Sequence, residues 1–182
     1  MWAKGVNRAW VFVLLVLLAA ACARPTITVP EREVPVTEEA AQRFEEKLLA
    51  FQEITNGEVK LTFSEAEVTS YIRLRLLEAQ RSLPVLEPTI WFSGGNVYIA
   101  GQLNVPSLSV SGDAVIVLTA TVEQNRLQVS VRKALIAGVP VPRRVLQRLS
   151  DLANDRMSNT IGPITIRDLQ VLEGEIIVVL SR

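Results

Sequence analysis

The strongest constraint on the fold is a period-two alternation of apolar and polar residues that fills much of the chain after residue 88. From Leu127 to Arg132, for example, leucine and valine alternate with glutamine, serine and arginine, which is typical of a strand with one face in water. Short segments rich in glycine, asparagine or proline separate such runs and favour turns, at Gly94-Gly95-Asn96, residues 106–112 and Gln124-Asn125. The pattern predicts four strands that pair antiparallel through short links: Thr89–Ser93, Val97–Val105, Asp113–Glu123 and Arg126–Leu135.

Two stretches depart from the alternation because they are apolar at consecutive positions. They are Val115–Leu118 and Ile176–Leu180. A strand of this kind presents apolar side chains on both faces, whereas an antiparallel sheet with one solvated side alternates. We therefore expect a second layer or a ligand to cover the other face of these strands.

The C-terminal region predicts a hairpin. Residues 164–172 read as a strand whose apolar parity changes partway, which indicates a β-bulge near Arg167 and Asp168. Glu173-Gly174 then turns the chain into the final strand, which contains the apolar run described above.

Before the meander, two amphipathic helices flank one strand. Thr37 can cap the first helix, and Asn56-Gly57 ends it. The segment Glu58–Phe63 alternates like a strand. Ser64 and Glu67 have the spacing of a capping box and begin the second helix, whose apolar positions continue to residue 83.

A third helix is predicted after Pro142, a residue that fits the first turn of a helix. Its inward stripe is expected to contain Val145, Leu149, Leu152 and Ala153, with Leu146 and Met157 beside it. Together these elements predict an α+β fold, in which a curved antiparallel β-sheet, made of the meander and the C-terminal hairpin, packs on two to three amphipathic helices. Residues 37–182 are expected to form a single α+β domain.

The N-terminus has the layout of an export signal. Lys4 and Arg8 precede an apolar run over residues 9–21, which is shorter than the roughly 20 residues that span a bilayer. The run ends at Cys22, the only cysteine. Residues 22–36 contain three prolines and no periodicity, so they are expected to be an extended tether. We therefore assign residues 1–21 to a signal peptide.

The residues before the cysteine, Leu18-Ala19-Ala20-Ala21-Cys22, resemble a bacterial lipobox. The resemblance implies a lipoprotein whose Cys22 carries acyl chains such as palmitate and anchors the domain to a bacterial membrane, outside the cytoplasm. Ala19 stands where leucine is commoner. Ordinary cleavage after an A-x-A pattern, or an uncleaved anchor, is the alternative reading.

Composition excludes several classes of function. The 182 residues contain no histidine, which removes Ser-His-Asp chemistry and histidine metal sites. The single cysteine leaves no disulfide or thiolate metal site. Without residues 1–21 the chain is slightly acidic, unlike a nucleic-acid-binding domain. We expect no cofactor, no metal and no nucleic-acid partner.

Four segments, in their order and spacing, are similar to the YpmS-like and LmeA-like exported bacterial proteins, which are related in shape to the tubular lipid-binding superfamily. They are Leu61–Val68, Gly94–Gly101, Gly138–Pro142 and Ile166–Glu175. The resemblance covers the chain from about Val59 to the C-terminus. It implies a strongly curved sheet wrapped against a long helix, with an elongated apolar trough for acyl chains and no shared catalytic residues.

On this basis we select candidate residues for binding a lipid or another apolar ligand. The candidate wall residues of the trough are Ile99, Leu103, Val115, Val117, Ile177 and Val179. Arg143, Arg144 and Arg148 lie near Arg132 and Lys133 in sequence and are candidates for contact with lipid phosphates. Alternatively, Arg144 and Arg148 pair with Asp151 and Asp155 on a solvated helix face.

The sequence thus favours a membrane-anchored, non-catalytic lipoprotein that binds a lipid or another apolar ligand. A second hypothesis is a structural or assembly lipoprotein that recruits an unidentified protein of the cell envelope without a small ligand. A third is an enzyme acting through Glu65, Glu67 or Asp113, but a helix start explains both glutamates and a turn explains the aspartate.

Overall fold

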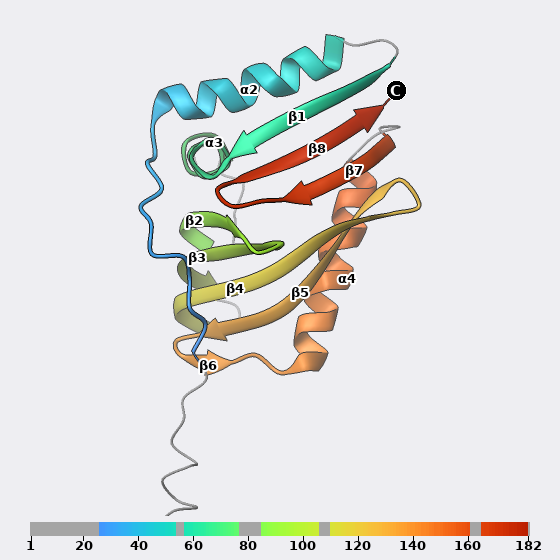
Figure 1. Cartoon of the computed structure of the whole chain (residues 1–182). Helices are drawn as coiled ribbons and strands as arrows, with labels where there is room; N and C mark the ends of the chain where they lie inside the picture. Colours follow the sequence, from blue (N-terminus) through green and yellow to red (C-terminus); the bar gives the residue numbers. More distant parts are fainter. Residues whose placement is uncertain (1–25, 54–56, 77–84, 106–109, 161–164, 182) are drawn as a thin grey trace, which may run out of the picture.

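The computed structural model describes residues 26–53, 57–76, 85–105, 110–160 and 165–181. These residues form two antiparallel sheets and three helices (Figure 1), which confirms the predicted α+β class. The signal peptide, Cys22, the first helix stop at Asn56, the end of the second helix and Ile164 lie outside the described residues.

The predicted helices and strands are present in the predicted order with shifted ends. In chain order the elements are α2 (Glu38–Glu53), β1 (Glu58–Ser64), α3 (Glu65–Tyr71), the π-helical segment η1 (Ile72–Leu76), β2 (Val85–Ser93), β3 (Asn96–Val105), β4 (Val110–Glu123), β5 (Arg126–Ile136), β6 (Val139–Pro140), α4 (Arg143–Thr160), β7 (Thr165–Val171) and β8 (Glu175–Ser181). The short strand β6 and the π-helical segment η1 were not predicted.

The strands divide into two sheets. The meander forms a five-stranded sheet in the order β2-β3-β4-β5-β6, and the C-terminal hairpin joins β1 in a three-stranded sheet in the order β1-β8-β7. β8 is the central strand of the smaller sheet, paired with β1 on one side and β7 on the other. The run of apolar residues in β8 is therefore flanked by strands on both edges, as expected for a central strand.

Two predicted local features are present at their predicted positions. The pairing of β7 with β8 shifts register between Ile166 and Asp168, which confirms the predicted bulge. Gln124 and Asn125 both have positive φ, 52° and 63°, as a tight turn with the twist of a hairpin requires. A second register shift, in the pairing of β4 with β5 between Val117 and Leu118, was not predicted.

The helix starts are also as predicted. The Ser64 hydroxyl accepts a hydrogen bond from the Glu67 N–H at 3.2 Å, and the Glu67 carboxylate accepts one from the Ser64 N–H at 3.0 Å. The Thr37 hydroxyl accepts a hydrogen bond from the Ala40 N–H at the start of α2. These contacts satisfy N–H groups that have no partner inside the helix.

Two apolar clusters form the core. The first lies between α2 and the smaller sheet around the buried Phe51, Leu61 and Phe63. The second lies between α3 and the larger sheet around Ile90, Phe92 and Val97. Val68 of α3 and Ile176 of β8 pack against both clusters. The two sheets therefore share one continuous core, with α3 at the junction.

The predicted inward stripe of α4 is wrong. Val145, Leu149 and Leu152 are 44%, 40% and 59% exposed, whereas Leu146 and Ser150 are buried against the sheet. The helix is turned so that polar residues meet the edge of β5. The physical reason is that unpaired backbone groups on that edge require hydrogen bonds, and α4 supplies them through Ser150 and Asn154.

The described residues before α2 have no regular structure, but Arg32 fixes them to the domain. Its guanidinium forms two hydrogen bonds to the Glu65 carboxylate, at 2.6 and 2.9 Å, and one to the Phe92 carbonyl at 2.8 Å. It also pairs with Glu173 in the turn between β7 and β8. The Trp91 indole N–H donates to the Arg32 carbonyl oxygen at 2.9 Å. Arg32 therefore connects the N-terminal segment to α3 and to both sheets.

Candidate functional site

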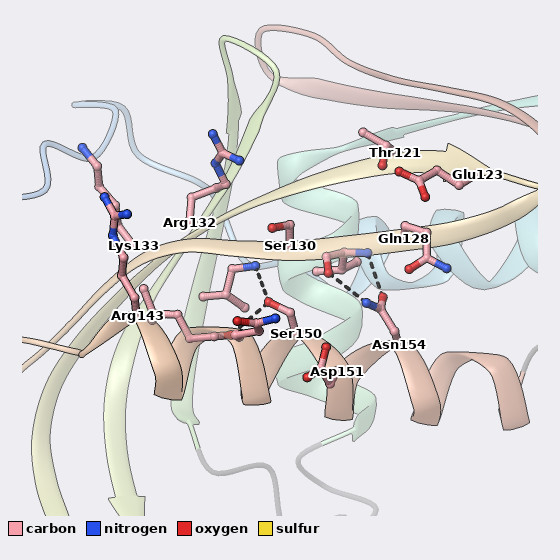
Figure 2. Close-up of a pocket in the computed structure, with 14 residues that line it drawn as sticks. Thr121, Glu123, Gln128, Ser130, Arg132, Lys133, Arg143, Ser150, Asp151 and Asn154 are labelled. Carbon is pink, nitrogen blue, oxygen red and sulfur yellow. Dashed lines mark hydrogen bonds between the residues drawn. The ribbon is translucent and has the colours of Figure 1, made fainter.

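The larger of two described grooves lies between α4 and the β4–β5 ribbon (Figure 2). Its volume is about 720 Å³. The floor consists of polar side chains from β4 and β5, among them Thr121, Gln128 and Ser130, and the wall consists of the inward face of α4. The groove is therefore lined mainly by polar groups, unlike the apolar trough that the family resemblance implies.

Side chains of α4 hold the helix against β5. The Ser150 hydroxyl accepts a hydrogen bond from the Val131 N–H at 2.8 Å. The Asn154 amide accepts one from the Val129 N–H at 2.8 Å and donates one to the Val129 carbonyl at 3.1 Å. Asn154 thus pairs with Val129 as the backbone of a neighbouring strand would. These contacts fix the width of the groove and cover an otherwise open sheet edge.

Basic residues gather at one end of the groove. Figure 2 shows Arg132, Lys133 and Arg143 at this end, and Glu123 at the other. Arg132 and Lys133 are consecutive, but the bulge in the β4–β5 pairing leaves Arg132 without a cross-strand partner, because Val117 pairs with Lys133 and Leu118 with Val131. The bulge allows two adjacent basic side chains to reach the same groove.

The three candidate arginines do not lie on the same surface. Arg143 lines the groove, but Arg144 and Arg148 do not; both are exposed. Neither forms an ion pair with Asp151 or Asp155 among the residues that the structure describes, so the alternative pairing along the helix is not observed. Asp151 lines the groove instead.

The six candidate wall residues do not lie on one surface. The register of β3 with β4 places Ile99 and Leu103 on one face of the larger sheet and Val115 and Val117 on the other. Ile177 and Val179 lie on the face of the smaller sheet that points away from the α2 cluster, since Ile176 and Leu180 pack into that cluster. Val117 and Ile177 are buried, and the other four are half-buried.

The register instead reveals one continuous apolar surface, which we call the apolar strip. It lies on the face of the β4–β5 ribbon that carries Ile99 and Leu103, opposite the polar groove. At one end Leu118 packs against the buried Ile90 cluster. None of its members is fully buried. The strip consists of Ile116, Leu118, Ala120, Val122, Leu127, Val129 and Val131.

Sequence reasoning missed this strip and the residues that hold α4. The alternation of apolar and polar residues in β4 and β5 could have indicated the strip. The polar positions Thr119 and Thr121 pair with Ser130 and Gln128, which leaves the apolar positions together on the other face. The signal for α4 was a pair of polar residues four positions apart, Ser150 and Asn154, on one helix face. Their role depends on the open edge of β5, which only the pairing of strands identifies.

Two of the three candidate catalytic carboxylates, Glu65 and Glu67, have partners within the fold. The Glu65 carboxylate accepts hydrogen bonds from the Arg32 guanidinium and from the Phe92 N–H, the latter at 2.5 Å. Burial raises the pKa of the Glu67 carboxyl, but the Lys47 ammonium at 2.7 Å, together with the Ser64 N–H and the Arg43 guanidinium, outweighs it and holds the pKa below its usual value. Asp113 is exposed, and its carbonyl accepts the Ala137 N–H beyond β5.

The smaller groove lies beside the N-terminal segment. It has a volume of about 380 Å³ and is lined by residues 28–32 with Ser93, Tyr98 and Glu173. Hydrogen bonds from Ser93 and from the Arg32 guanidinium hold the pKa of Glu173 below its usual value. The groove results from the way the segment crosses the sheet, and two of its charged residues, Arg32 and Glu173, pair with each other.

The described part of the chain contains neither a candidate metal site nor a candidate membrane-spanning helix. It contains no group of three acidic, histidine or cysteine side chains suited to a metal ion. Within the same residues, no helix combines the length and apolar character required to cross a bilayer. Comparisons with protein-family models, curated proteins and solved structures find no match to this chain.

Proposed function

We propose that this protein is a bacterial lipoprotein whose extracytoplasmic domain binds a lipid or another apolar ligand without catalysing a reaction. The lipid on Cys22 anchors the domain to the membrane, as the lipobox-like residues indicate. The observation that carries the ligand-binding part is the apolar strip on the β4–β5 ribbon.

The strip supports this proposal because none of its seven side chains is fully buried, although Leu118 packs with Val171 of β7 against the Ile90 cluster. Between Leu118 and Val131 its side chains alternate with the polar residues of the groove face, so the apolar residues of this part of the ribbon lie on one side. Each acyl methylene buried against such a surface contributes about 0.8 kcal/mol before the cost of ordering the chain is subtracted. Of the candidate wall residues, Ile99 and Leu103 share this face and remain in the proposed site.

The partners of the carboxylates support a non-catalytic role. A general acid or base needs a group free to exchange a proton with substrate. Glu65 and Glu67 instead accept backbone N–H groups and bind cations within the fold. Their positions at the start of α3 account for both residues structurally.

The experiment is native mass spectrometry of the full-length lipoprotein after gentle extraction, with a matched pair of variants on β4. Val122→Thr places a hydroxyl in the strip, and Val115→Thr makes the same change on the opposite face. We expect co-purified lipid in the wild type and in Val115→Thr, and a several-fold lower occupancy in Val122→Thr. Mass spectrometry of the intact protein also reports the acyl groups on Cys22.

The possible outcomes test the ligand site, the protein partner and the lipid anchor separately. Equal lipid occupancy in both variants contradicts the strip as the site. Protein free of lipid that is captured at stoichiometric yield by a cross-linked envelope protein favours the assembly hypothesis. Loss of the acyl mass in Cys22→Ala with unchanged membrane fractionation contradicts the anchor.

A further inference from the structure

The face of α4 that points away from the sheet combines exposed apolar and basic residues. Val145, Leu149 and Leu152 follow a helical spacing of four and three and are 44%, 40% and 59% exposed. Arg144 and Arg148 flank this stripe and are exposed. Val139, at the start of β6 just before the helix, is 64% exposed. We call these six residues the α4 face.

The charge around the start of α4 is strongly positive. Besides Arg144 and Arg148, the three basic residues of the polar groove lie at the same end of the helix, where Figure 2 shows them together. The acidic residues of α4, Asp151 and Asp155, come later along the helix, and Asp151 lines the groove. An apolar stripe beside basic side chains is the pattern of helices that lie in the surface of an anionic bilayer.

The start of the described chain lies at this same end of the molecule. In Figure 1 the N-terminal segment begins level with β6, at the end of the view where α4 also begins. Thr26 follows Cys22 by four positions, so an extended chain between them spans about 14 Å at most. Arg32 fixes the segment to the domain. An anchor at Cys22 therefore holds the bilayer at the end of the domain where β6 and the start of α4 lie.

We propose that the α4 face docks on an anionic phospholipid bilayer and fixes the orientation of the anchored domain. The occupant is the bilayer because its acyl region accepts the valine and leucine side chains and its phosphates complement Arg144 and Arg148. This inference rests on the proposed lipid anchor, and it explains why α4 exposes an apolar stripe while its polar residues face the sheet.

The experiment places an environment-sensitive fluorophore on the face through Leu149→Cys in the full-length chain. Leu49→Cys on α2 is the matched control, because Leu49 is also an exposed helical leucine, at 58%, but lies one helical turn after the acidic residues Glu45 and Glu46. Each variant is made with Cys22 present and with Cys22→Ala. Vesicles contain phosphatidylcholine alone or mixed with phosphatidylglycerol, with a lipid-borne bromine quencher.

In both Cys22 backgrounds we expect blue-shifted, quenched emission at position 149 with phosphatidylglycerol present, and unchanged emission at position 49. In the Cys22→Ala background, Arg144→Gln with Arg148→Gln is expected to weaken vesicle binding about 25-fold, since each basic residue near an anionic surface is worth about five-fold. High salt is expected to have a similar effect.

The outcomes for the anchor and for the α4 face are distinguishable. Protein with Cys22 that floats with vesicles while positions 149 and 49 respond alike overturns the docking face and leaves the anchor intact. Protein with Cys22 that fails to float overturns the anchor, and the probe at position 149 in excess anionic vesicles still decides the docking face. A response at position 149 without phosphatidylglycerol dependence overturns the role of the arginines.

Discussion

Arg32, in the segment before the first described helix, forms two hydrogen bonds with Glu65, the first residue of α3. Glu65 also accepts the Phe92 N–H from the neighbouring strand, and its side chain is only 8% exposed. One ion pair thus connects three segments that are far apart in sequence. It makes the N-terminal segment part of the folded domain.

We expect Arg32→Ala to lower the free energy of unfolding by about 1 to 3 kcal/mol. The substitution leaves the buried Glu65 carboxylate without its cation, which is costly, although Arg32 is about one-third exposed and water screens part of the loss. Urea denaturation followed by circular dichroism measures the change. Arg43→Ala is the control, because Arg43 is 54% exposed and lies 3.4 Å from Glu67. An equal loss of unfolding free energy in the two variants would contradict the role assigned to Arg32.

Asn154→Ala is expected to destabilise the fold by about 1 to 2 kcal/mol, because it leaves the backbone groups of Val129 without a protein partner. Hydrogen exchange should show faster exchange of the Val129 amide than in the wild type. Gln147→Ala, on the same helix and lining the same groove, is exposed and is expected to change stability by less than about 0.5 kcal/mol. Unchanged protection of Val129 in Asn154→Ala would contradict the edge-covering role.

The lowered pKa of Glu67 predicts how the stability of the fold changes in acid. Its pKa in the folded protein lies below the ordinary value of 4.5, so the ionised carboxylate stabilises the fold above that pH. This stabilisation is lost as the pH falls through the folded-state pKa. We expect stability to decline below about pH 4.5 in the wild type and to decline less steeply in Glu67→Gln. Thermal unfolding over this pH range measures the slope, and Glu46→Gln, at an exposed position, should retain the wild-type slope.

Gly101→Ala is expected to cost about 2 to 3 kcal/mol because the added methyl group would overpack the pairing of β2 with β3. A Cβ at this position would lie 2.6 Å from the Val85 side chain and 2.7 Å from the Leu86 carbonyl oxygen. Gly138→Ala provides the comparison, since it meets no atom within 4 Å and only its backbone at φ 76° resists the change, at about 1 to 2 kcal/mol. A smaller loss for Gly101→Ala than for Gly138→Ala in chemical denaturation would be inconsistent with this packing.

The order of elements could be predicted because the information is local. The capping box of Ser64 and Glu67, the turn at Gln124-Asn125 and the bulge near Asp168 each depend on a few neighbouring residues. The α+β class followed from the same periodicities. The candidate site was less predictable, because Ile99 and Val115 read alike in sequence and only the register shows that they lie on opposite faces.

By itself, the sequence determined which segments become helices and strands, since side-chain spacing and backbone preferences act within a few residues. Tertiary structure decided which strands share a sheet, which side of α4 faces inward and where Arg32 docks. Those outcomes depend on distant partners. The unpaired edge of β5 requires hydrogen bonds, Ser150 and Asn154 supply them, and that requirement turned the apolar stripe of α4 toward solvent.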